Sequence, residues 1–155
     1  MNKACVFCAI VQGEEPSSKV YEDEQVLAFL THRPTRPGEL LVIPKDHIDH
    51  FTDLEESVAG RMVVCAHRLG NVLRVELKPL RVGFVVSGFG VPHAHLIVLP
   101  LHEEQDITSA RFARVDGGEI RYSVSDLPEW SRADLDQLAE RLHGKLIRMR
   151  PIRKE

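Results

Sequence analysis

The sequence lacks any apolar stretch long enough to span a bilayer, and its N-terminus lacks the apolar run of a signal peptide. A membrane-spanning protein is therefore not expected, and a cytoplasmic location is the default. Basic residues are not in excess either, because the 155 residues carry a net charge of −3 with acidic and basic side chains interspersed. This balance gives no indication of a basic surface for nucleic acid.

Cysteine is also scarce. The chain has three, two of them in the sequence Cys5-Val6-Phe7-Cys8. So few thiols, in a reducing compartment, argue against a disulfide-stabilised scaffold. What is present is typical of a globular protein, with 43% apolar and 28% charged residues. The length suits one domain, residues 1–155, that can bury a substantial core.

The apolar pattern divides this domain into a core, residues 1–100, and a C-terminal extension, residues 101–155. Short apolar runs bounded by turn residues predict strands in the core. These runs are residues 19–22, 25–30, 39–44, 82–86 and 91–99. Capping-box spacing at residues 52–55 predicts the start of a long helix that ends near Glu76. Strands and helices without a βαβ rhythm indicate an α+β fold with an antiparallel sheet.

The extension is more polar than the core. Residues 116–119 suggest a hairpin turn. Ser131 is expected to cap a last helix that carries Leu135, Leu138 and Leu142 on one face.

The most informative segment is residues 91–99, an apolar run that contains two histidines. Side chains alternate along a strand, so His93, His95 and Ile97 are expected on one face. Imidazole can act as a nucleophile, transfer protons or bind a metal at neutral pH. We therefore expect the chemistry of this protein at this strand.

Four segments, in this order, resemble the histidine triad (HIT) family of nucleotide-binding proteins. Cys5 to Pro16 is similar to the zinc-binding N-terminus of the bacterial branch, and Val20 to Phe29 to the first hairpin. Pro37 to His47 is similar to the central strand and the histidine after it. Val91 to Leu99 resembles the signature motif, in which histidines alternate with apolar residues.

The resemblance implies a five-stranded antiparallel sheet with two main helices, followed here by an extension that ends in a helix. It also implies a homodimer whose sheets join, and a reaction in which His95 attacks the α-phosphate of a nucleotide. Phe29 matches the position that packs against the base. Gly88 and Gly90 lie where backbone amides are needed for the phosphate, because glycine lets the backbone approach closely.

The signature departs from the family at its third histidine, which is replaced by Ile97. Isoleucine cannot donate a proton to a leaving group, and general acid catalysis is typically worth about 10²–10⁴-fold. The turn before His93 is also several residues shorter than is usual in the family. These departures predict that nucleotide affinity and turnover both differ from those of the family.

The resemblance also brings together four metal ligands, Cys5, Cys8, His47 and His93. Two thiolates and two imidazoles suit a tetrahedral structural Zn²⁺. The alternatives for Cys5 and Cys8 are a redox dithiol and two inert surface thiols.

Three functions are consistent with these residues. The first is an enzyme, a hydrolase or nucleotidyl transferase that acts on a nucleoside phosphoramidate or a dinucleoside polyphosphate through His95. The second is a nucleotide-binding protein with weak or no catalysis. The third is a zinc-stabilised homodimeric interaction module.

Overall fold

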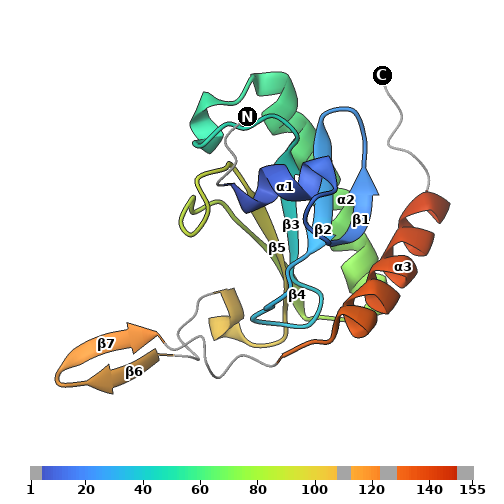
Figure 1. The fold of residues 1–155 in the computed structure, drawn as a ribbon. Helices are drawn as coiled ribbons and strands as arrows, with labels where there is room; N and C mark the ends of the chain where they lie inside the picture. Colours follow the sequence, from blue (N-terminus) through green and yellow to red (C-terminus); the bar gives the residue numbers. More distant parts are fainter. Residues whose placement is uncertain (1–4, 108–112, 123–128, 150–155) are drawn as a thin grey trace.

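The centre of the protein is a five-stranded antiparallel sheet, as expected for the α+β class (Figure 1). The computed structural model describes residues 5–107, 113–122 and 129–149. The strand order is β1-β2-β3-β5-β4, so β1 and β4 are the two edges. The strands are β1 (Ser18–Glu22), β2 (Val26–Leu30), β3 (Leu40–Pro44), β4 (Arg81–Val85) and β5 (Leu96–Leu101).

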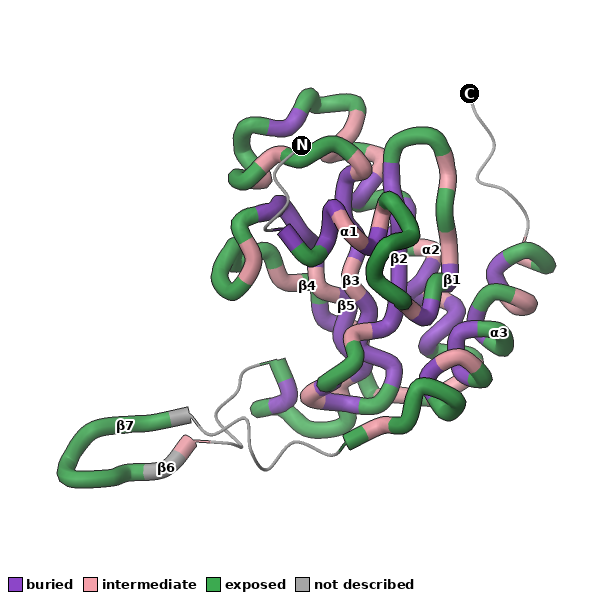
Figure 2. The backbone as a smooth tube through the Cα atoms, viewed as in Figure 1, coloured by how far each residue is buried: buried purple, intermediate pink, exposed green. Residues whose placement is uncertain are grey.

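Helices cover both faces of this sheet. The long helix α2 (Glu56–Glu76) and the C-terminal helix α3 (Arg132–Arg148) lie on one face, and the short helix α1 (Val6–Gln12) lies on the other (Figure 1). Every residue of β2 is buried for this reason, as the central strands in Figure 2 show. Val26, Ala28 and Leu30 face α2 and α3, whereas Leu27 and Phe29 face α1. No described helix has the length and apolar character needed to cross a membrane.

The long helix begins later than its capping-box spacing predicts. Phe51–Asp53 forms a single turn of 3-10 helix, and α2 starts only at Glu56. Leu54 separates them in an extended conformation, with φ −68° and ψ 145°, and its side chain is buried in the core. Burial of Leu54 outweighs the local helix signal at Thr52, while the predicted end at Glu76 is confirmed.

The strand that was expected to contain both histidines also differs from its prediction. β5 starts at Leu96, so residues 91–95 are irregular, and it continues through Pro100 to Leu101. The Ala94 N–H donates to the Ile48 carbonyl at 2.6 Å, which draws this segment toward the loop after β3. Pro100 is tolerated because the pairing with β3 has ended at Val98, so only β4 lies beside it.

The C-terminal extension contains the two elements that its sequence predicts. The Asp134 N–H donates to Ser131 Oγ at 3.1 Å and caps α3, and Leu135, Leu138 and Leu142 are buried. The hairpin of β6 (Ala113–Asp116) and β7 (Glu119–Tyr122) turns at Gly117 and Gly118. In Figures 1 and 2 it stands away from the sheet and is largely exposed.

Candidate metal and nucleotide site

Two cysteines and two histidines from distant parts of the chain meet beside α1. Cys5 is the N-cap of α1, Cys8 lies in its first turn, His47 follows β3 and His93 precedes β5. Their ligand atoms all lie within 4.8 Å of one another. His93 Nδ1 lies 3.4 Å from Cys5 Sγ and 3.7 Å from Cys8 Sγ, and His47 Nδ1 lies 3.2 Å from Cys8 Sγ.

These separations suit a zinc ion. With Zn–S bonds of about 2.3 Å and Zn–N bonds of about 2.0–2.1 Å, tetrahedral ligand atoms lie about 3.3–3.8 Å apart. Among the described residues, this is the group of cysteine, histidine and acidic side chains that could hold a metal ion. The structure therefore contains a possible Cys2His2 metal site, made of the four residues that the resemblance implied.

The hydrogen bonds of His93 orient its ring for this role. His93 Nε2–H donates to the Pro44 carbonyl at 2.9 Å, so the lone pair of the neutral ring is on Nδ1, which faces the two thiols. Burial lowers the pKa of His93, although the Pro44 carbonyl opposes this effect. A neutral imidazole with its lone pair toward the cysteines is the form that binds a metal.

The thiols are shielded from water as well. Cys5 and Cys8 are both buried and free of disulfides. Burial raises the pKa of the Cys8 thiol, and its contact with Cys5 raises it further. A nearby cation would favour the thiolate form of Cys8, and Zn²⁺ would supply that charge.

His95 lies next to this cluster but is not part of it. Its Nδ1–H donates to the backbone carbonyl of His93 at 2.8 Å. A carbonyl oxygen can only accept, so the proton of the neutral ring is on Nδ1 and the lone pair is on Nε2. The residue is 5% exposed, and its ring packs edge-to-face against Phe7 of α1 with a centroid distance of 5.6 Å.

Phe7 connects His95 to a cavity on the same face of the sheet. Its ring also packs edge-to-face against Phe29 of β2, at 5.7 Å. Phe29 lines a cavity of about 140 Å³ together with Val6 and Ile10 of α1. A cavity with apolar and polar walls has the composition of a small-molecule site, and Phe7 separates it from the ring of His95.

The strand register places Ile97 on this same face. Phe29 pairs with Leu41, and Leu41 pairs with Ile97, so the three residues form one row across β2, β3 and β5. Ile97 is partly exposed. No proton donor is therefore supplied by this position in the row.

Gly88 and Gly90 lie in the exposed loop between β4 and His93. Their φ angles are 72° and 96°, a backbone conformation that residues other than glycine rarely adopt. A Cβ atom at either position would meet nothing within 4 Å, so the backbone, and not crowding, requires glycine here.

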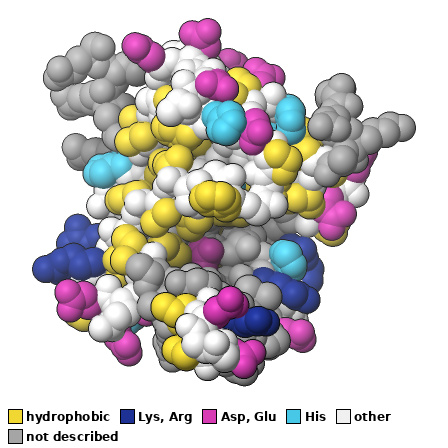
Figure 3. Space-filling view, turned by 90° about the vertical axis from the view of Figure 1, so that its left-hand side faces the viewer, with side chains coloured by type: hydrophobic (Ala, Val, Ile, Leu, Met, Phe, Trp, Pro, Cys, Tyr) yellow, Lys and Arg dark blue, Asp and Glu magenta, His cyan; other side chains and the backbone are white. Residues whose placement is uncertain are grey.

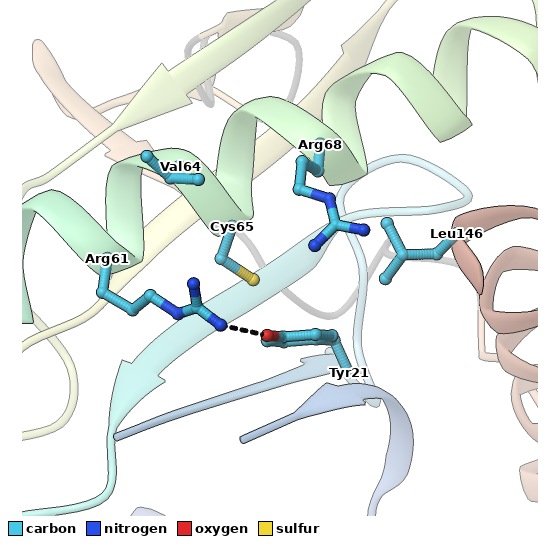
Figure 4. A pocket seen from close by; sticks show the side chains of 6 residues that line it. All are labelled: Tyr21, Arg61, Val64, Cys65, Arg68 and Leu146. Atoms are coloured by element: carbon cyan, nitrogen blue, oxygen red, sulfur yellow. Dashed lines mark hydrogen bonds between the residues drawn. The ribbon is translucent and has the colours of Figure 1, made fainter. Parts of the chain in front are cut away.

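A second cavity, on the opposite face of the sheet, is too small for a ligand. It has about 10 Å³, which is about the room that one water molecule needs. Figure 4 shows Arg61 of α2 directed at Tyr21 of β1, with Cys65 beside them. Burial raises the pKa of the Cys65 thiol to about 12, so this cysteine is an inert core residue, as its place on the apolar face of the helix suggests.

Two features of the site were missed by sequence reasoning. Helix α1 was not predicted, although Phe7, Cys8 and Ile10 are buried on one side of it and Gly13 ends it with φ 77°. The apolar run followed by glycine was the available signal. The contribution of α3 to the cavity, through Arg132, has no sequence signal because α3 reaches the cavity through tertiary contacts with a segment more than 100 residues earlier in the chain.

Comparisons of the sequence and of the structure with known proteins all match the same family. Residues 12–104 match the HIT domain family. Protein hit of Bacillus subtilis is 34% identical over 107 residues, which cover 66% of this chain and 74% of that protein.

Solved structures agree with this assignment. A zinc-bound histidine triad family protein from Mycobacterium smegmatis superposes with a TM-score of 0.70 at 28% identity, covering 94% of this chain and 95% of that chain. A HIT family hydrolase from Legionella pneumophila gives a TM-score of 0.52 at 34% identity, covering 61% of this chain and 90% of that chain.

Proposed function

Because this chain belongs to the HIT family, we propose that it is a hydrolase or nucleotidyl transferase that uses His95 to attack the α-phosphate of a nucleotide. The observation that carries the proposal is the hydrogen bond from His95 Nδ1–H to the His93 carbonyl. It directs the lone pair of Nε2 away from the backbone and stabilises the positive charge that develops on the ring during attack.

The reaction has two steps. In the first, the Nε2 lone pair forms a bond to the α-phosphorus, and the bond from phosphorus to the leaving group breaks with its electron pair. In the second, water or the hydroxyl group of another acceptor attacks the same phosphorus and loses a proton to solvent, while the bond from phosphorus to Nε2 breaks with its electron pair and the neutral imidazole leaves. Amides of the loop with Gly88 and Gly90 would stabilise the phosphate oxygens, and the cavity at Phe29 would hold the base.

The metal site has a structural part in this proposal. Cys5, Cys8, His47 and His93 would hold Zn²⁺, which when bound cross-links α1 to the segments after β3 and before β5. Since the zinc-bound M. smegmatis protein has the same fold, a structural zinc is the cofactor that we propose.

Ile97 determines which leaving groups this site can release. A phosphoramidate releases an amine, which needs a proton, whereas a dinucleoside polyphosphate releases a nucleotide anion, which does not. With no donor at Ile97, we propose that the polyphosphate is the better substrate. The same residue is the reason to keep an alternative function, a nucleotide-binding protein with little catalysis.

Binding of nucleotide is the first property to test. A nucleoside monophosphate at about 100 times its Kd should stabilise the zinc-loaded protein by about 2.7 kcal/mol. For a chain of this length, that is a rise in Tm of roughly 5–10 °C. Thermal unfolding with and without millimolar AMP and GMP measures it, and an unchanged Tm with both would contradict the enzyme and its binding alternative together.

Replacing Ile97 with histidine should restore a proton donor beside the leaving group. We expect turnover of a nucleoside phosphoramidate to rise by about 10²-fold, with little change for a dinucleoside polyphosphate. Ile97→Val, which stays apolar, is the matched control. If Ile97→His leaves the ratio of the two rates unchanged, the lack of a donor at this position does not limit the reaction.

We further propose a homodimer through the edge strand β4. Figure 3 looks onto this side of the molecule and shows hydrophobic side chains gathered across it. Phe84, Val86 and Phe89 are 47%, 47% and 87% exposed, and no strand of the described residues pairs with the outer edge of β4. An antiparallel edge can pair with the same edge of a second copy about a two-fold axis, which joins the two sheets.

The mass in solution tests this dimer. Light scattering after size exclusion should give twice the mass of the 17.5 kDa chain, and Phe84→Glu should shift it toward one chain. Val115→Glu, on the exposed β6–β7 hairpin, is the control for an added charge. A wild-type protein with the mass of one chain would overturn the dimer.

A further inference from the structure

The cavity at Phe29 has an apolar side and a polar side. Val6, Ile10 and Phe29 form the apolar part, which would face the flat surface of a base. The polar side chains of the lining are those of Glu15, Ser17, His32 and Arg132. Glu15 and Ser17 lie in the segment between α1 and β1, His32 follows β2, and Arg132 is the first residue of α3.

The first observation that points to a ligand on this side of the cavity concerns Ser17. Among the described residues, its Oγ is one of the few buried side-chain polar atoms without a hydrogen-bond partner. A buried hydroxyl without a partner costs about 1–3 kcal/mol, so native proteins usually satisfy it. A polar group of a bound molecule would supply the partner of Ser17.

Arg132 is the second sign, because hydrogen bonds hold its guanidinium at this side. Its Nη1 donates to Ser18 Oγ at 3.0 Å, and its Nη2 donates to the Pro16 carbonyl at 3.3 Å. Ser18 Oγ in turn donates to Asp136 at 2.6 Å, which ties the segment to α3. A guanidinium has five N–H donors, so three of those on Arg132 are left for a ligand.

We propose that Glu15, Ser17 and Arg132 read the polar edges of the base and select guanine over adenine. This inference rests on the proposed nucleotide-binding function and specifies its substrate. Guanine presents two acceptors, O6 and N7, to which arginine binds in its commonest base-specific contact, and it presents N–H donors to a carboxylate such as Glu15. Adenine has an amino group in place of O6, so a donor would face the donors of Arg132.

The test compares the affinity of the zinc-loaded full chain for GMP and AMP by calorimetry. Neither monophosphate carries a leaving group, so binding is measured without turnover. We expect GMP to bind at least about tenfold more tightly than AMP. Arg132→Met should lower the affinity for GMP by about tenfold and leave the affinity for AMP nearly unchanged. Glu15→Gln should also lower the affinity for GMP.

Two variants separate base recognition from the docking of α3. Arg141→Met removes an exposed arginine of the same helix that bonds to Glu76, outside the cavity, and should keep the preference for GMP. Asp136→Ala breaks the link between the segment and α3 but keeps Ser18 Oγ, the acceptor that holds the guanidinium, and it should also keep most of the preference. If Asp136→Ala loses the preference as Arg132→Met does, Arg132 acts only through the docking of α3 and the inference is wrong.

The remaining outcomes distinguish this inference from the proposed function. Equal binding of GMP and AMP, or tighter binding of AMP or CMP than of GMP, would overturn the guanine preference while nucleotide binding stands. Absence of binding by every nucleotide would overturn both.

Discussion

Replacing His95 with alanine should abolish nucleotide cleavage, with a loss of at least about 10³-fold in kcat. The substitution removes the proposed nucleophile, whose Nδ1–H is held by the His93 carbonyl and whose ring packs against Phe7, the neighbour of Phe29. The measurement is a rapid-quench assay with a nucleotide labelled at the α-phosphate. Wild-type protein should carry the label covalently within one turnover, and His95→Ala should carry none.

The controls for this result concern folding and the identity of the histidine. His95→Ala should keep its zinc, because His95 lies outside the Cys2His2 cluster. His143→Ala is the matched control, since His143 also contacts a backbone carbonyl, that of Val20, through Nδ1 at 2.8 Å but lies on α3. Labelling that survives in His95→Ala would mean that another group attacks the phosphorus, and the mechanism proposed here would fail.

Loss of the metal is expected to have the largest effect on stability. Structural zinc in small domains has an apparent binding free energy on the order of 10–16 kcal/mol. Here the sheet retains its packing against α2 and α3, so we expect a smaller loss, roughly 3 kcal/mol or about 10 °C in Tm. The Cys8→Ser variant, or wild-type protein treated with a chelator, should show this loss by calorimetry.

The metal content identifies the cause of that loss. Wild-type protein should contain about one zinc per chain, because the four candidate ligands lie together and match the four ligands of a structural zinc site. Cys65→Ala is the control, because it removes the third cysteine from the core cluster and should keep the zinc. If Cys8→Ser keeps both its zinc and its Tm, Cys8 is not a ligand and the proposed metal site is wrong.

Nucleotide binding should also fall when the metal is removed. Val6 and Ile10 lie on α1, whose N-cap is Cys5, and both line the cavity at Phe29. An α1 that is no longer cross-linked would leave this wall of the cavity unsupported. The Cys8→Ser variant should therefore show a smaller rise in Tm with GMP than wild-type protein does.

Much of the fold was predictable because its signals are local. β2 and β3 are continuous apolar runs, and Ser131 caps α3 as its spacing to Asp134 predicts. Where a local signal competed with burial, burial prevailed, as at Leu54, which delays the start of α2. The single-domain boundary over residues 1–155 stays a prediction.

The candidate site was predictable only as a set of residues. The sequence, through its resemblance to the HIT family, singled out His95, Phe29, the two loop glycines and the four metal ligands. It could not show that Cys5 and His93, 88 residues apart, have ligand atoms 3.4 Å from each other. It also could not show which carbonyl accepts the hydrogen bond from His95. That carbonyl belongs to His93, and it is within reach because residues 91–95 are irregular and do not form a strand.

The sequence by itself determined the class of fold, the order of its strands along the chain and the residue types available for chemistry. These follow from the periodicity and turn residues of short segments, which act over a few positions. The tertiary structure alone decided that α1, the loop after β3 and the segment before β5 meet at one point, and that Arg132 of α3 closes the cavity at Phe29. The physical reason is that burial of apolar side chains on both faces of the sheet is a property of the whole chain, and it fixes distances that no local pattern encodes.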